Sequence, residues 1–209
     1  TDAVQWFGKE PFSDIHQFNA DLVSVCAHKF YGPKGAGLLF LRSPLRPDPI
    51  LFGGGHENER RAGTENLAVI VGLVEALERF VPTPVFSRPQ LTPLADELRA
   101  KLESLPDTLL VGADAQRLVN TISFLVDGAD SIALLAGLDL EGICASSGSA
   151  CSAGSLSPSH VISALGVAPR LANSLVRFSL GRQTSRSEVD YVTKILPTVI
   201  HRAKPVKDT

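Results

Sequence analysis

A run of small residues around Cys151 is the first place where this sequence could do chemistry. Apart from that one thiol, positions 146–155 hold only serine, glycine and alanine. Because its side chains are small, such a segment buries little surface and can move as a flexible loop. This suits a thiol that must travel between two positions. The pattern favours a cysteine nucleophile carried on a movable loop.

Lys29 is the candidate partner upstream of that thiol. It follows the apolar, strand-like run 22–26 and precedes a turn at Gly32-Pro33. A lysine at a strand end, in a partly dry site, can form a Schiff base with a carbonyl compound. Taken alone, such a residue is more often a surface lysine. Together with a mobile thiol, it favours an enzyme that uses pyridoxal phosphate (PLP) and a cysteine nucleophile.

The composition is that of a globular protein that acts on small molecules. The 209 residues are 44% hydrophobic, enough for one large domain or two small ones. Lysine and arginine number 20 against 22 acidic residues, a net charge of −2, which favours neither nucleic acid nor an anionic membrane as partner. No apolar run approaches the roughly 18 residues of a membrane span. Three cysteines without a C-x-x-C pair indicate free thiols and a cytoplasmic location.

The order of the predicted elements divides the chain in two. A buried parallel strand at 22–26, a return strand at 38–41 and a helix at 67–80, capped by Thr64 or Asn66, lie in residues 1–80. Prolines 82, 84, 89 and 93 then mark a boundary. Residues 81–209 alternate helices and strands, an α/β unit with helices at 94–105, 131–138, 161–165 and 188–200 and strands at 109–111, 121–126, 143–144 and 175–180. The sequence contains no methionine, and we expect it to be the carboxyl part of a longer polypeptide.

Six motifs stand in one order along the chain: DAVQ at 2–5, AHKFYGPKG at 27–35, GGGHE at 53–57, RAGT at 61–64, SSGSAC at 146–151 and RFSLGR at 177–182. This ordered set resembles the cysteine desulfurases, PLP enzymes of fold-type I in the class-V aminotransferase family, and specifically their long-loop group. The resemblance runs over essentially all of the chain. It implies an α/β fold in which residues 1–80 are the carboxyl-terminal part of a PLP-binding large domain with a mixed, mostly parallel sheet. Residues 81–209 would form a smaller α/β domain carrying the cysteine loop.

The resemblance also implies which residues hold the cofactor. Lys29 would bind PLP and then shuttle the proton at the substrate Cα. Asp2 would face the pyridine nitrogen and Gln5 the phenolate oxygen, although a turn cap is the simpler role for a lone aspartate. His28 would bind the phosphate, and Thr64 would reach the phosphate of a neighbouring subunit, which makes the predicted enzyme a homodimer.

The remaining predicted roles concern substrate and sulfur. Arg177 would clamp the substrate carboxylate, with a structural salt bridge as the alternative. Cys151 would attack the sulfur of cysteine bound to PLP, so that the carbon–sulfur bond breaks, the enzyme keeps a persulfide on Cys151 and the alanine enamine stays on the cofactor. Cys144 is expected to be a core thiol. Cys26 stands where the family commonly has a serine, and a thiol is a poor donor to phosphate.

The predicted function is conversion of L-cysteine to L-alanine, with the sulfur passed to an acceptor protein such as an iron-sulfur scaffold or used in thio-cofactor synthesis. Three alternatives stay open. One is a selenocysteine lyase or a related enzyme of the class-V fold. Another is a non-catalytic fragment that keeps the partner-binding loop. The third is a zinc site built from Cys26, His28, Cys144 and Cys151, for which no C-x-x-C pair exists.

Overall fold

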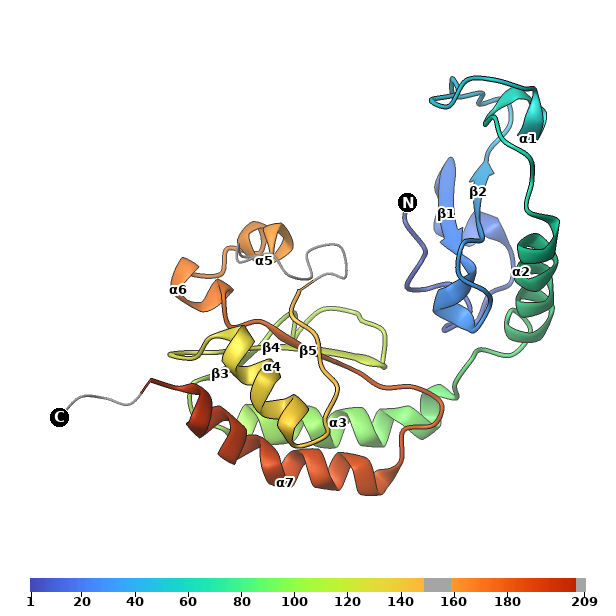
Figure 1. Cartoon of the computed structure of the whole chain (residues 1–209). Coiled ribbons are helices and arrows are strands. Elements are labelled where there is room, and N and C mark those ends of the chain that lie inside the picture. Colours follow the sequence, from blue (N-terminus) through green and yellow to red (C-terminus); the bar gives the residue numbers. More distant parts are fainter. Residues whose placement is uncertain (149–158, 206–209) are drawn as a thin grey trace. The chain divides into compact units, whose positions relative to one another are not determined.

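The protein consists of two compact units, Thr1–Phe86 and Ser87–Thr209. The computed structural model describes residues 1–148 and 159–205 (Figure 1). The division between the units falls between Pro84 and Pro89, inside the proline-rich segment that the sequence predicts as a boundary. Each unit has its own sheet, of two strands in the first and three in the second. The predicted α/β class is confirmed.

The sheet of the first unit is a hairpin of β1 (Leu22–Cys26) and β2 (Gly37–Leu41), paired antiparallel with Cys26 opposite Gly37. Burial alternates along β1, where Val23 and Val25 point into the core. On its other side, β1 meets residue Asp2 in a single parallel bridge to Ser24. The predicted bounds of β1 are confirmed. Among the described residues, β1 pairs in parallel only at this bridge, whereas its pairing with β2 is antiparallel.

Turns and helices complete the first unit. The 3₁₀ helix η1 (Ile15–Phe18) precedes β1, and the 3₁₀ helix η2 (Ala27–Phe30) follows it. The short helix α1 (His56–Glu59) leads to α2 (Leu67–Phe80), which has the predicted bounds. Asn66 caps α2 by accepting a hydrogen bond from the backbone N–H of Val69 at 3.3 Å.

Aromatic side chains form a cluster in the first unit, in which Phe7 and Phe30 are buried. The ring centroids of Trp6 and Phe18 lie 4.9 Å apart, and those of Phe7 and Phe12 lie 4.8 Å apart. Phe7 also contacts Phe30, the last residue of η2, at 5.7 Å. Offset and edge-on ring pairs of this kind add to the free energy gained by burial alone. The cluster ties the first residues of the chain to the turn that follows β1.

The sheet of the second unit runs in the order β3 (Thr108–Leu110), β4 (Thr121–Val126), β5 (Val176–Ser179), with both pairs antiparallel. Leu125 packs with Ile162, Ala172 and Leu175, on the face covered by α5 (His160–Ala164) and α6 (Pro169–Ala172). Its neighbour Phe124 is fully buried on the opposite face, because successive side chains of a strand point to opposite faces of the sheet. Figure 1 shows that α3 (Arg88–Ser104), α4 (Ser131–Leu140) and α7 (Arg186–Ala203) cover that opposite face.

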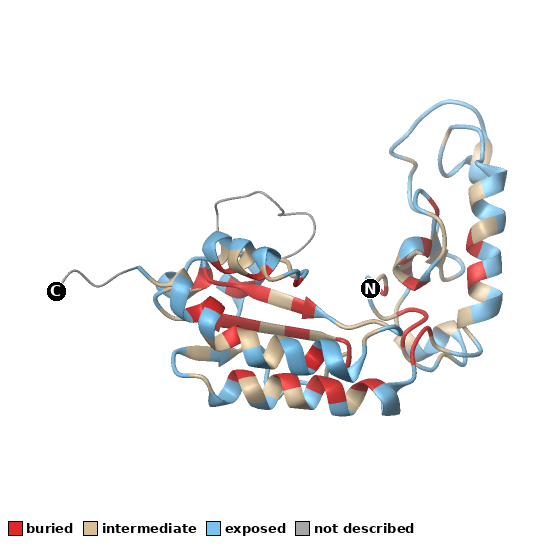
Figure 2. Ribbon diagram, turned by 60° about the horizontal axis from the view of Figure 1, so that its bottom comes forward, coloured by how far each residue is buried: buried red, intermediate tan, exposed pale blue. Residues whose placement is uncertain are grey.

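Buried residues follow the strands and the inward sides of these helices (Figure 2). Two helix ends are set by local chemistry. Asp130 caps α4 by accepting from the N–H of Ile132, and Ser185 and Glu188 form a reciprocal capping box at α7.

Along residues 1–148 and 159–205, no helix is both long enough and apolar enough to cross a membrane.

Three sequence predictions in the second unit were wrong. Helix α3 begins at Arg88 rather than at residue 94, because a first helical turn tolerates Pro89, whose missing N–H would have no partner there. The predicted strand at 143–144 is a loop, and the backbone pairs later, at Ser146 with Arg177. In that loop Ile143 takes the buried position, so Cys144 is exposed and is not a core thiol.

Candidate active site

The bridge between Asp2 and Ser24 collects predicted site residues at one edge of the first unit. The backbone N–H of Ala3 donates to Ser24 at 3.0 Å, and that of Ser24 donates to Thr1 at 3.1 Å. Because two parallel segments end at the same edge, the residues that follow them emerge there together. Gln5 follows the first segment, and the His28-Lys29 pair follows the second.

Lys29 lies on η2 between two fully buried residues, Ala27 and Phe30, and is itself half-buried. The N–H of Ala27 donates to the carbonyl of Ala36 at 3.0 Å, and the N–H of Gly32 donates back to Ala27 at 2.9 Å. These bonds close the turn across the end of the hairpin. The backbone of Lys29 is therefore held from both sides, while its side chain extends from a core-anchored turn.

Two glycines allow this turn to approach its neighbours. Gly8 has a φ of +73°, and a Cβ placed on it would lie 2.6 Å from the Cβ of Phe30. A Cβ on Gly32 would lie 2.8 Å from the Cβ of Ala27. Carbon atoms cannot pack at such distances, so a side chain at either position would displace η2.

Asp2 is exposed, and its Oδ1 accepts a hydrogen bond from the N–H of Val4 at 2.8 Å. The turn cap considered from the sequence is therefore present. No described residue hydrogen-bonds to its second oxygen, Oδ2. Asp2 also borders a small hollow of about 290 Å³ beside Trp6 and Phe18. One carboxylate oxygen shapes the turn, and the other is available to a ligand.

Gln5 makes a contact that the sequence analysis did not foresee. The ammonium of Lys9, which is only 8% exposed, donates to Gln5 Oε1 at 2.7 Å. The spacing of four residues across a turn was the available signal, because it brings two side chains to one face.

His28 and Cys26 meet beside Lys29. The Sγ of Cys26 lies 3.9 Å from Nε2 of the exposed His28. Both stand where the resemblance predicts phosphate binding. The zinc hypothesis gains no support here, since within residues 1–148 and 159–205 no three metal-ligating side chains form a group. Cys144, its third proposed ligand, belongs to the second unit.

Thr64 is not brought to the edge that carries Lys29. It is exposed in the loop 53–66, which Figure 1 shows beyond the opposite end of the hairpin. His56 Nδ1 accepts from the N–H of Gly63, and Glu65 Oε1 accepts from that of Glu57, both at 3.3 Å. Hydrogen bonds from its own backbone N–H and from that of Glu57, together with the charge of His56, hold the pKa of Glu65 below its ordinary value.

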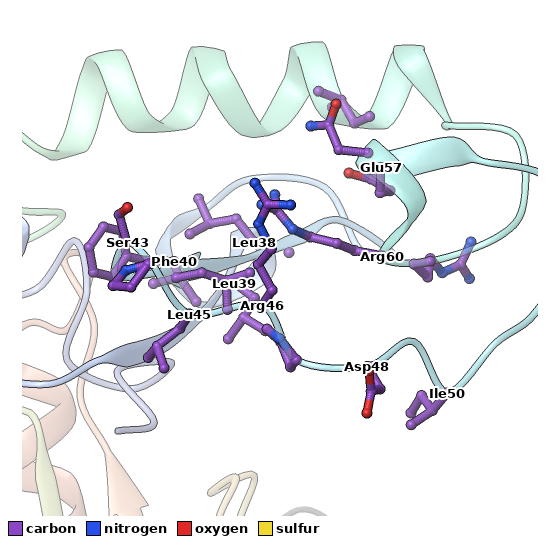
Figure 3. A pocket seen from close by; sticks show the side chains of 18 of the residues that line it. Leu38, Leu39, Phe40, Ser43, Leu45, Arg46, Asp48, Ile50, Glu57 and Arg60 are labelled. Carbon is purple, nitrogen blue, oxygen red and sulfur yellow. The ribbon is translucent and has the colours of Figure 1, made fainter.

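A larger cavity of about 1100 Å³ lies elsewhere in the first unit (Figure 3). Its wall combines apolar side chains of β2, such as Leu38 and Phe40, with the guanidinium groups of Arg46 and Arg60. None of the predicted site residues lines it.

In the second unit, Arg177 lies on β5 next to the segment that leads to Cys151. Its backbone N–H donates to Ser146 at 2.7 Å, and its Nη1 donates to the carbonyl of Gly148 at 3.2 Å. Its Nε is buried, and no described residue accepts from it. No described carboxylate pairs with Arg177 either. Cys151 itself lies outside the described residues.

Comparison with known proteins adds the following findings. Residues 1–192 match the family model described as aminotransferase class-V. The chain is 40% identical over 207 residues to "Cysteine desulfurase IscS" of Dictyoglomus turgidum, covering 99% of this chain and 52% of that protein. It is 41% identical to "Cysteine desulfurase NifS" of Azotobacter vinelandii, covering 99% and 51%. A solved NifS-like protein from Rickettsia africae superposes with a TM-score of 0.84 at 29% identity, covering 96% and 52%. The chain thus spans about half the length of the curated relatives it matches.

Proposed function

Because this chain belongs to the aminotransferase class-V family, we propose that it functions as a PLP-dependent cysteine desulfurase. The proposed reaction converts L-cysteine to L-alanine and passes the sulfur on through Cys151. One observation carries the proposal: relatives about 40% identical over nearly the whole chain are named cysteine desulfurases.

The residues at the edge of the first unit fit a pyridoxal cofactor. When bound, PLP supplies an electron sink for the bonds at the substrate Cα. Lys29 binds the cofactor through its amine and then moves the proton at Cα. Asp2 would hold the ring nitrogen protonated, and its Oδ2, the carboxylate oxygen that the turn does not use, is available for that role. Gln5 donates to the phenolate oxygen.

The phosphate is bound by His28, with Cys26 as a weak donor beside it, and by Thr64 of a second subunit. Two observations support a homodimer. Thr64 is exposed and lies away from the edge that carries Lys29. Large apolar side chains just before and just after the same loop are also exposed, with Ile50 at 89%, Phe52 at 83% and Leu67 at 71%. Exposed apolar side chains of this size favour, where they gather on one surface, a contact with another polypeptide.

Arg177 binds the carboxylate of L-cysteine. Its buried Nε supports this role, since a guanidinium N–H without a partner costs free energy until an acceptor arrives. A carboxylate can accept two N–H bonds from one guanidinium at once. Cys151, as the thiolate, takes the sulfur and delivers it to an acceptor such as an iron-sulfur scaffold in the cytoplasm. The roles of Cys151 and of the acceptor rest on the sequence motif.

One paired experiment tests the proposal on the complete protein. With PLP added, the wild type should show the visible absorption band of a lysine-bound cofactor, and Lys29→Ala should lose it. Arg177→Ala should keep the band but raise KM for L-cysteine about 10- to 150-fold, the equivalent of about 1.5–3 kcal/mol of charge-assisted hydrogen bonding.

Three results would contradict the proposal: no band in the wild type, a band that Lys29→Ala leaves unchanged, or an unchanged KM in Arg177→Ala. The first result would favour a non-catalytic fragment. A much higher kcat/KM for selenocysteine than for cysteine would favour a selenocysteine lyase.

A further inference from the structure

Lys9 is a buried lysine whose position the proposed reaction leaves unexplained. Only 8% of its surface is exposed, and the other buried polar residues among those described, Asn120 and Ser174, are uncharged. Burial of an ammonium is costly unless good acceptors surround it. The side chains that accept hydrogen bonds from the Lys9 ammonium therefore bear on its role.

The side-chain amide of Gln5 is one acceptor for Lys9, at 2.7 Å from Nζ to Oε1. An ammonium carries three donors and no acceptor, so the atom of the amide that faces it must be the oxygen. The contact therefore sets the orientation of the amide, with Oε1 toward Lys9 and the Nε2 amide NH2 on the other side.

The backbone around this pair is fixed. The N–H of Phe7 donates to Ala3 at 2.8 Å, and that of Lys9 donates to Trp6 at 3.1 Å. Gly8, between Phe7 and Lys9, packs on Phe30, the residue after Lys29. The turn that carries Gln5 and Lys9 is thus built on the same core contact as the turn that carries Lys29.

We propose that Lys9 is a positioning residue, which turns the Gln5 amide so that its Nε2 amide NH2, and not its carbonyl, faces the phenolate oxygen of the cofactor. This inference rests on the proposed PLP site. Without Lys9, the amide of Gln5 can flip, and its carbonyl then opposes a negatively charged oxygen. Lys9 stays out of contact with the cofactor and acts through Gln5.

The effect has a spectroscopic signature. A donor on the phenolate oxygen stabilises its anionic form and so lowers the affinity of the lysine–cofactor linkage for its proton. Loss of that donor raises the pH midpoint at which the visible band of the bound cofactor titrates. In the complete protein loaded with PLP, Lys9→Met should raise this midpoint by about 0.5–1 pH unit.

A double-mutant comparison separates positioning from a general structural role. Gln5→Leu should raise the midpoint by at least as much as Lys9→Met, and Lys9→Met should add nothing in the Gln5→Leu background. Lys101→Met, the same change on α3 of the second unit, should leave the midpoint at the wild-type value. If Lys9→Met does not fold, Lys9→Gln replaces it. The new glutamine at position 9 can either donate to the Gln5 amide or accept from it, so it orients that amide less strictly than Lys9 does. Lys9→Gln should therefore raise the pH midpoint by less than Lys9→Met.

Two results would overturn the inference while leaving the proposed function intact. One is a wild-type pH midpoint in the folded Lys9 variant. The other is a rise of the midpoint by Lys9→Met that is the same in the wild type and in the Gln5→Leu background. Absence of any cofactor band in the wild type would instead remove the proposed PLP site itself. The titration therefore distinguishes failure of the inference from failure of the proposed function.

Discussion

The two turns of the first unit that carry predicted site residues are held in opposite ways. The turn of Lys29 is anchored by the buried side chains of Ala27 and Phe30 and by a close contact with Gly8. The loop of Thr64 is exposed and is closed by hydrogen bonds of 3.3 Å, such as that from Gly63 to His56. The position of Lys29 follows from the core of its own unit. The position of Thr64 depends on surface contacts, as suits a residue proposed to act on a second subunit.

The largest expected effect comes from removing the anchor of the Lys29 turn. Phe30→Ala should destabilise the complete protein by about 3–5 kcal/mol, because it empties a fully buried ring site. The matched control, Phe52→Ala, changes a ring that is 83% exposed immediately before the Thr64 loop and should cost less than about 0.5 kcal/mol. Denaturant unfolding monitors both. Equal losses in the two variants would mean that the two turns are not held differently.

A smaller effect separates close packing from backbone strain. Gly8→Ala should cost about 2–4 kcal/mol and weaken PLP binding, because the new Cβ meets Phe30 at a positive φ. Gly35 has a φ of +88°, and a Cβ placed on it would have no atom within 4 Å, so Gly35→Ala should cost only about 1–2 kcal/mol. Thermal or denaturant unfolding gives both values. The packing argument fails if Gly35→Ala is the more damaging of the two.

The smallest effect is a pH response confined to the Thr64 loop. Because the folded loop lowers the pKa of Glu65, its contribution to stability is present above the ordinary pKa of 4.5 and is lost as the pH falls through the lowered value. The amide resonance of Glu57, which donates to Glu65, should shift over that acidic range by NMR. Glu65→Gln should abolish the shift, and the amide of Ala27 should show none. A matching shift at Ala27 would contradict the comparison.

Much of the fold followed from residue patterns. The apolar run at 22–26 predicts β1, and the recurrence of apolar residues predicts α2, both with the observed bounds. The strand predicted at 121–126 also has the observed bounds. The start of α3 was missed because proline, usually a helix breaker, is tolerated in a first turn. The strand predicted at 143–144 failed because two apolar residues do not reveal which of them the core will take.

The candidate site was only partly predictable. The ordered motifs led to the class-V aminotransferase family, and that resemblance is confirmed. The pairing of Lys9 with Gln5, and the use of one Asp2 oxygen as a turn cap, depend on the backbone between these residues. The turn cap was already the simpler role for a lone aspartate, whereas the partner of Gln5 emerges only when the turn is known, which is why the motifs named Gln5 and Asp2 but not Lys9.

The direct test of the proposed function is to find where the sulfur of L-cysteine goes. The complete protein, loaded with PLP and given L-cysteine, should gain the mass of one sulfur atom on the peptide that contains Cys151, as alanine forms. Peptide mass spectrometry also reports Cys26 and Cys144 as internal controls, which should stay unmodified. Alanine formed at an undiminished rate by Cys151→Ala, or sulfur found only on Cys26 or Cys144, would contradict the account.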